Sequence, residues 1–196
     1  MQVDLRSLVG FALRSLLGPA DAARRIMTLN FSRSILWQAL VLVTIAGVLA
    51  SALTQGPVLA LPLGTEMVGV APFGYAMILG GSLVLLVFAL HFTGQMLGGT
   101  GDFSQTLALV IWIEAIAVLI RLAQSVILVA VPDVGGVVAL AGMVILLWCL
   151  LNFVSVLHGF DSLWRAALTL LLAVIGITLG LTVILTLISV TAFGDI

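Results

Sequence analysis

The feature that most constrains this chain is an apolar run, residues 103–131, which follows a glycine-rich turn at residues 98–102. About 20 apolar residues are enough for a helix to cross the hydrocarbon core of a bilayer. Glu114 and Arg121 lie inside the run, and they are the only ionisable side chains well within any apolar segment. A charge at bilayer depth is costly, so both side chains need a partner or a water-filled cavity.

The composition indicates that lipid surrounds most of the chain. Of its 196 residues, 63% are hydrophobic and 8% are charged, whereas soluble domains carry about 25% charged residues. All seven basic residues are arginine, which favours a GC-rich, bacterial source, and the net charge of −1 leaves no basic surface for a nucleic acid. The single cysteine, Cys149, provides neither a disulfide framework nor metal-ligand spacing.

Four further apolar runs accompany the first, so we predict an all-α membrane protein with five transmembrane helices. The spans are expected at about residues 34–53, 75–96, 103–131, 137–157 and 166–191, within a single domain that covers residues 1–196. Between the first two spans, residues 58–63 and 67–73 flank Gly64-Thr65-Glu66, a pattern typical of a short β-hairpin.

The first 33 residues are predicted to form an amphipathic helical segment. One face of a helix over residues 1–17 carries Leu5, Leu8, Val9, Ala12, Leu13 and Leu16. Gly18-Pro19 ends this helix and begins a second one over residues 20–28. Because Arg24 and Arg25 lie close by, we expect both helices to lie in the membrane interface. The alternative is a helix that docks in the groove of a partner protein.

The distribution of arginine predicts the orientation. The residues before the first span include Arg6, Arg14, Arg24, Arg25 and Arg33, and Arg165 lies between the fourth and fifth spans. The loops on the other side, residues 54–74 and 132–136, contain no Lys or Arg. The positive-inside rule therefore predicts a multi-pass protein of the bacterial inner membrane with a cytoplasmic N-terminus and a periplasmic C-terminus.

Two groups of polar residues are candidates for function. Glu114 and Arg121 are two helical turns, or about 10 Å, apart, so they can meet only if Arg121 folds back or if Gln124 and water intervene. Glu114 is then either a proton or cation relay, or a structural acid satisfied by a neighbouring span while Arg121 snorkels to the outer interface. The second group is a polar cluster expected at the cytoplasmic ends of the spans: His91, Gln95, Asn152, His158 and Asp161.

We expect the cytoplasmic cluster to form interfacial hydrogen bonds rather than a metal site, because its residues have no fixed ligand spacing. Ser155, His158 and Asp161 are spaced like a triad, but no supporting motif accompanies them, so no enzyme and no cofactor is expected.

Small residues and tryptophans indicate how the helices pack. The pairs Gly94/Gly98 and Gly176/Gly180 have the small-xxx-small spacing that lets helices approach closely in lipid, either within the chain or, for the fifth span, in a dimer. Among the tryptophans, Trp37 and Trp164 are expected at the membrane interface, and Trp112 and Trp148 are expected to be buried.

Three stretches of the chain also carry a family resemblance. They are Gly18-Pro19, Gly98-Gly99-Thr100-Gly101-Asp102-Phe103-Ser104-Gln105-Thr106-Leu107, and Leu157-His158-Gly159 through Arg165-Ala166-Ala167-Leu168. In order and spacing they resemble the Yip (Ypt-interacting protein) family of five-span membrane proteins, in particular its bacterial branch. The resemblance implies an all-helical bundle, a cytoplasmic N-terminus and no catalytic activity. Eukaryotic relatives associate with Rab-type GTPases, but this chain lacks their long acidic N-terminal region, which argues against GTPase binding.

Two classes of function follow from the sequence. We expect a non-catalytic scaffold or accessory subunit that contacts the bilayer and other membrane proteins or a second copy of itself. The alternative is a small proton- or ion-coupled transporter or channel built around Glu114, although the sequence has no inverted repeat or paired broken spans. Tight, dry packing around Glu114 would favour the scaffold, and a water-accessible cavity reaching it would favour transport.

Overall fold

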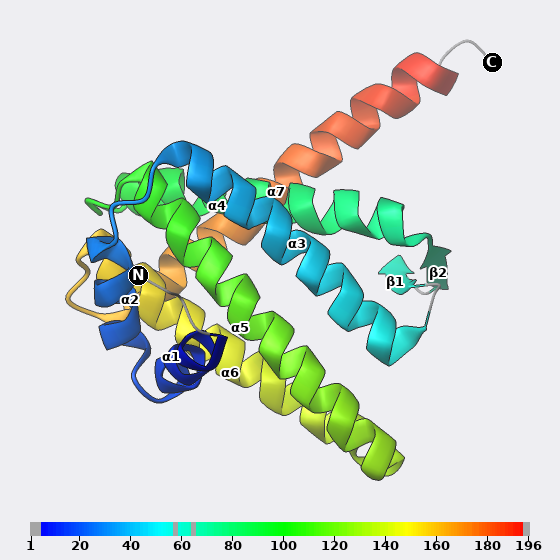
Figure 1. The fold of residues 1–196 in the computed structure, drawn as a ribbon. Coiled ribbons are helices and arrows are strands. Elements are labelled where there is room, and N and C mark those ends of the chain that lie inside the picture. The colour runs from blue at the N-terminus through cyan, green and yellow to red at the C-terminus, as the bar shows by residue number, and fades with distance from the viewer. Residues whose placement is uncertain (1–4, 57–58, 64–65, 194–196) are drawn as a thin grey trace.

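The computed structural model describes residues 5–56, 59–63 and 66–193, which form seven α-helices, one short 3-10 helix and two β-strands (Figure 1). Five of these helices are long and apolar enough to cross a membrane. They are α3 (Arg33–Gln55), α4 (Pro72–Met96), α5 (Phe103–Ala130), α6 (Gly135–His158) and α7 (Leu163–Phe193). Every predicted span boundary lies within three residues of the corresponding helix end, so the predicted fold class is confirmed.

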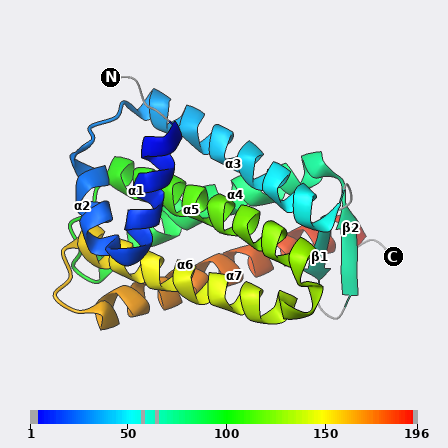
Figure 2. The same ribbon diagram turned by 60° about the horizontal axis from the view of Figure 1, so that its bottom comes forward.

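Successive long helices run in alternating directions, which gives the bundle two distinct ends (Figures 1 and 2). At one end α3, α5 and α7 begin, α4 and α6 finish, and the helices α1 (Leu5–Leu17) and α2 (Pro19–Thr28) lie nearby. We call this the arginine-rich end, because α1, α2 and the starts of α3 and α7 carry six of the seven arginines: Arg6, Arg14, Arg24, Arg25, Arg33 and Arg165.

The opposite end, called the hairpin end, contains the two strands and the turn between α5 and α6. Strands β1 (Leu59–Leu63) and β2 (Glu66–Val70) pair antiparallel, with Leu59 opposite Val70, so the predicted hairpin is confirmed. The short helix η1 (Pro132–Val134) connects α5 to α6.

Local sequence signals set the start of α5, the central helix. Asp102 is its N-cap: its carboxylate accepts a hydrogen bond from the backbone N–H of Ser104, and the side chain of Gln105 accepts one from the N–H of Asp102. This capping box satisfies backbone donors that a helix start leaves free. Gly98, with φ of +83°, makes the sharp turn before it. The glycine-rich entry therefore turns the chain from the end of α4 into α5, which packs mainly against α3.

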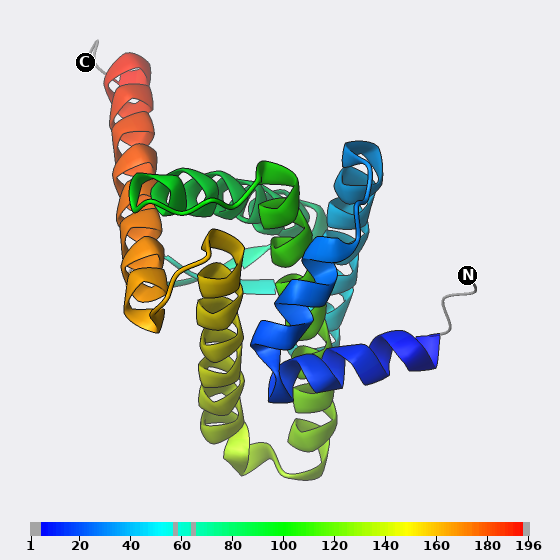
Figure 3. The ribbon, with the colours of Figure 1, turned by 90° about the vertical axis from the view of Figure 1, so that its left-hand side faces the viewer.

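The N-terminal helices are part of the bundle, because α1 and α2 pack against α5 and α6 (Figures 2 and 3). The indole N–H of Trp112 donates a hydrogen bond to Ser15 Oγ at 3.1 Å, and the rings of Phe11 and Trp112 lie 4.9 Å apart. On the outer face of α1, Leu13 is 56% exposed and Leu17 is 91% exposed. Such an apolar outer face suits a helix partly sunk into lipid.

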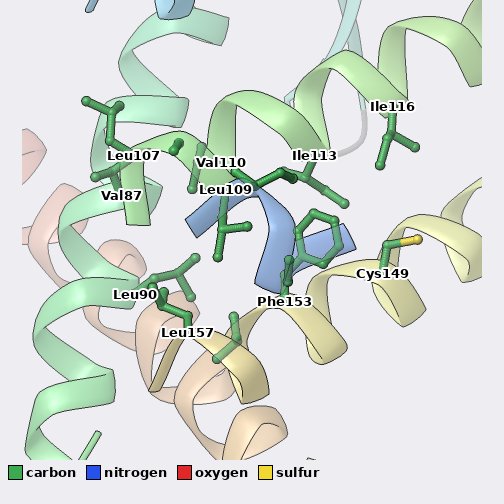
Figure 4. Close-up of a cluster of buried hydrophobic side chains, with 14 of the residues drawn as sticks. Val87, Leu90, Leu107, Leu109, Val110, Ile113, Ile116, Cys149, Phe153 and Leu157 are labelled. Atoms are coloured by element: carbon green, nitrogen blue, oxygen red, sulfur yellow. The ribbon is translucent and has the colours of Figure 1, made fainter. Parts of the chain in front are cut away.

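Side chains from α4, α5 and α6 form a close-packed apolar core on the half of the bundle toward the arginine-rich end (Figure 4). It includes Val87, Leu90, Leu107, Val110, Phe153 and Leu157. Trp112 is half-buried beside this core. The prediction for Trp148 was wrong: it is 50% exposed on α6 and faces outward, where lipid can solvate an indole as well as a protein interior can.

Helix α7 belongs to the bundle only over its first part. Ala166, Thr169 and Ala173 are buried against neighbouring helices, of which α4 and α6 are the main ones. Beyond Ala173 no described side chain of α7 is buried. The rest of the helix projects past the other spans (Figures 1 and 3).

Candidate functional site

Glu114 and Arg121 form an ion pair within α5. Arg121 Nη1 lies 2.8 Å from Glu114 Oε1, although the residues are seven positions apart. Helical side chains tilt toward the N-terminus, and the long arginine side chain can therefore reach back along its own helix. The expectation that Glu114 bonds to a neighbouring span while Arg121 snorkels outward was wrong. The charges instead compensate each other inside the bundle.

The ion pair rests against the backbone of α3 at Gly47. A Cβ atom at Gly47 would lie 2.9 Å from Glu114 Oε1 and 3.3 Å from Arg121 Nη1, so any larger residue there would force the pair to shift. A similar fit occurs between α5 and α6: Gln124 Nε2 donates a hydrogen bond to the carbonyl of Val138 at 2.9 Å, and its amide fills the space beside Gly142. Both contacts join α5 to a neighbouring span.

A cavity of about 490 Å³ reaches this ion pair from between α4, α5 and α6. Glu114, Arg121 and Gln124 are its only polar side chains, and the remaining lining is apolar or small. A second cavity of about 250 Å³ shares Arg121 and Gln124 and extends toward Leu128 and Gly135 at the hairpin end. Open space therefore lies between the ion pair and the hairpin end.

The apolar core between α4, α5 and α6, on the side of Glu114 toward the arginine-rich end, is more tightly packed. The pocket lined by Leu90, Val110, Phe153, Leu157 and their neighbours holds only about 10 Å³, and a cavity needs at least about 10–15 Å³ to hold one water. Its walls are the apolar core of Figure 4, apart from Thr106. Apolar side chains therefore fill this part of the bundle between Glu114 and the arginine-rich end.

His158 occupies a second unusual site, where the end of α6 meets the turn between α4 and α5. Its side chain is 2% exposed and lies against three glycines, Gly94, Gly99 and Gly101. A Cβ atom at Gly94 or Gly99 would collide with the imidazole, and one at Gly101 would press on Leu157 and the imidazole. The backbone N–H of Thr100 donates to the carbonyl of His158 at 3.2 Å. The glycine-rich turn is thus a cradle for one histidine, which we call the glycine cradle.

The predicted cytoplasmic cluster is assembled only in part. His91 lies close enough to His158 for the two rings to interact electrostatically. Asn152 instead donates to the carbonyl of Trp148 in its own helix. Gln95 and Asp161 are exposed. The five residues share one end of the bundle, and their joint role in interfacial hydrogen bonding stays a prediction.

The glycines predicted to pack helices have different environments. Gly94 contacts His158 in the glycine cradle, whereas Gly98 serves the turn through its positive φ. Around Gly176 and Gly180 on α7, a Cβ atom would meet nothing within 4 Å. The alternative in which these two glycines pack inside the chain was therefore wrong.

With the geometry established, comparison with known proteins identifies the family. A family model described as the Yip1 domain matches residues 13–185. The chain belongs to the Yip1 domain family. The match covers the end of α1, all of α2 to α6 and most of α7, and so includes the ion pair, the glycine cradle and the projecting glycines. No curated protein and no solved structure matches the chain.

In this Yip1 domain, sequence reasoning missed two glycines that shape the site. Gly47 and Gly142 lie within apolar spans, where a lone glycine is common and carries no distinctive pattern. The available signal was indirect: each intramembrane polar side chain, Glu114 and Gln124, requires a small residue on a facing helix. Which helix faces it depends on tertiary packing.

Proposed function

We propose that this Yip1-domain protein is a non-catalytic scaffold or accessory subunit that acts through helix–helix contacts in a bacterial cytoplasmic membrane. The observation that carries the proposal is the projecting part of α7, which exposes small and apolar residues beyond Ala173 that the rest of the described chain does not cover. Helix faces with closely spaced glycines associate in lipid because their backbones can approach closely. A second copy of the chain is the partner we test first.

The proposed orientation places the arginine-rich end in the cytoplasm and the hairpin end outside. It is supported by the six arginines that α1, α2 and the starts of α3 and α7 carry, since cytoplasmic loops are enriched in Lys and Arg. The family match over most of the chain supports a single domain.

A transporter or channel is the second candidate, and the cavity that reaches Glu114 favours it. An ion pathway must also continue to the other side of the membrane. The close-packed core between Glu114 and the arginine-rich end argues against such a pathway. The internal Glu114–Arg121 pair further argues for a structural role, because the carboxylate already has a partner.

Cysteine cross-linking in native membranes tests the scaffold proposal. Val183 lies on the same helical face as Gly176 and Gly180, whereas Thr178 lies on the opposite face, and both Val183 and Thr178 are exposed. We expect Val183→Cys to form a disulfide-linked dimer and Thr178→Cys, the matched control, to form little. The unmodified chain, whose only cysteine is the buried Cys149, reports the background.

The glycines provide the second arm of this test. Replacing both Gly176 and Gly180 with Leu should abolish the Val183→Cys dimer while the chain still accumulates in the membrane, because neither glycine packs inside it. Equal cross-linking at Val183 and Thr178, or a dimer that survives the two leucines, would contradict self-association through this face.

A further inference from the structure

A pocket of about 370 Å³ lies between α1 and α2, outside every contact used by the proposed function. Three of the chain's seven arginines, Arg14, Arg24 and Arg25, line it. The only acidic residue in its wall is Asp21. The pocket therefore concentrates positive charge in a molecule whose overall charge is close to zero.

The charges of this pocket are poorly compensated. Asp21 pairs with Arg24 at 2.7 Å, but both side chains are largely exposed, and such surface pairs are weak in water. Within the described residues no acidic group pairs with Arg14 or Arg25. Two guanidinium groups thus retain donors that match the oxygens of a phosphate, which arginine binds through parallel hydrogen bonds.

The start of α2 adds to the positive field of the pocket. Gly18, the N-cap residue of this ten-residue helix, lines the pocket and provides no side-chain cap for the first backbone N–H groups. Free N–H groups and the helix dipole make such a terminus favourable for an anion. The terminus and the three arginines lie within one segment, residues 14–25, and line the same pocket.

The surroundings of the pocket indicate where its ligand comes from. Leu13 and Leu17 directly precede the pocket residues Arg14 and Gly18 in the chain, and both leucines are mainly exposed. Exposed leucines beside an arginine-lined pocket match the boundary between acyl chains and headgroups. We propose that this pocket binds the phosphate of an anionic phospholipid headgroup.

Lipid binding to the purified full-length chain tests the proposal. Native mass spectrometry would measure the occupancy of phosphatidylglycerol against phosphatidylcholine. We expect a clear preference for phosphatidylglycerol, and a loss of roughly 25-fold in its affinity when Arg14 and Arg25 are both replaced by Gln, about fivefold for each basic group. The matched control is Arg33→Gln with Arg165→Gln, which removes the same charge at the same end but outside the pocket, and which should change the affinity less than twofold.

A gain-of-binding variant separates the proposal from misfolding. Asp21→Asn removes the only carboxylate of the pocket and releases Arg24, so it should strengthen phosphatidylglycerol binding several-fold. A misfolded chain would not bind more tightly. Unchanged or weaker binding by Asp21→Asn would overturn the proposal, as would an equal loss of affinity in the two arginine double variants.

Free phosphate is the other source of the same chemistry. Inorganic phosphate and glycerol 1-phosphate, each added as a competitor, distinguish the two. If they fail to displace phosphatidylglycerol at millimolar concentration, the lipid is the ligand. If either competitor binds alone, and if its binding depends on Arg14 and Arg25 in the same way, the pocket is an anion site but the proposal that its ligand is a lipid is refuted.

Discussion

The close fit of His158 in the glycine cradle predicts that one added methyl group destabilises the bundle. In an open helical position, Gly→Ala stabilises a protein by about 0.5–1 kcal/mol. A Cβ atom at Gly94 would instead overlap the imidazole of His158, whose side chain is fully buried and has no free space to move into. Inserting a methyl group into such a core costs about 1–3 kcal/mol. Gly94→Ala should therefore lower the free energy of unfolding, whereas Gly→Ala in an open helical position raises it.

The assay is thermal unfolding of the purified chain in detergent, followed by tryptophan fluorescence. For a chain of 150–250 residues, 1 kcal/mol corresponds to roughly 2–4 °C in Tm, so Gly94→Ala should lower Tm by about 2–12 °C. Gly81 is the matched control: it also lies in α4, but a Cβ atom there would meet nothing within 4 Å. Gly81→Ala should leave Tm unchanged or raise it by a few degrees.

A double-mutant cycle tests the cause. In a His158→Ala background the overlapping imidazole is absent, so Gly94→Ala should then cost less than about 0.5 kcal/mol. The reasoning is refuted if Gly94→Ala is as stable as Gly81→Ala. It is also refuted if the cost of Gly94→Ala stays the same without the imidazole.

Three further predictions concern topology and the ion pair. Alkaline phosphatase fused after Ile196 should be active in the periplasm and the same fusion after Gly99 should be inactive; the reverse activities would refute the proposed orientation. Gly47→Ala should cost about 1–3 kcal/mol because its methyl group would press on the Glu114 carboxylate, and a Tm equal to wild type would show that α3 can move away. Glu114→Leu should cost about 3–5 kcal/mol because it leaves the Arg121 charge unpaired, whereas Glu114→Gln should cost less because its amide oxygen still accepts a hydrogen bond; equal Tm values for the two variants would contradict this.

The fold could be predicted largely from local patterns. Apolar runs longer than about 18 residues identify spans almost independently of tertiary context, because the bilayer fixes their length. The hairpin between the first two spans follows from two short apolar stretches that flank Gly64-Thr65-Glu66. Asp102 and Gln105 predict the start of α5, because a capping box lies within four consecutive residues and can be recognised without tertiary information.

The candidate site was less predictable because its contacts join distant parts of the chain. Spacing alone places Glu114 and Arg121 too far apart, and the side-chain conformation that brings them together depends on the room left by Gly47 on another helix. Likewise, the sequence of the glycine cradle indicates only a flexible turn. The glycines are needed because they contact His158, which lies more than 50 residues later in the sequence.

The position of α7 was also beyond sequence reasoning. Gly176 and Gly180 have the same spacing whether they pack inside the chain or face outward, and only the divergence of α7 after Ala173 distinguishes the two. Similarly, the amphipathic pattern of α1 is compatible with a free interfacial helix. Its hydrogen bond from Trp112 to Ser15 fixes it to the bundle instead.

Ion flux in reconstituted vesicles tests the central claim, a non-conducting scaffold, most directly. Wild type and Glu114→Gln would be inserted at equal density, and pH-dependent proton and cation flux would be compared with that of empty vesicles. Because the core between Glu114 and the arginine-rich end has no room for a chain of waters, we predict no flux above empty vesicles for either protein. Measurable wild-type flux that Glu114→Gln abolishes at unchanged thermal stability would contradict the scaffold and establish transport through the Glu114 cavity.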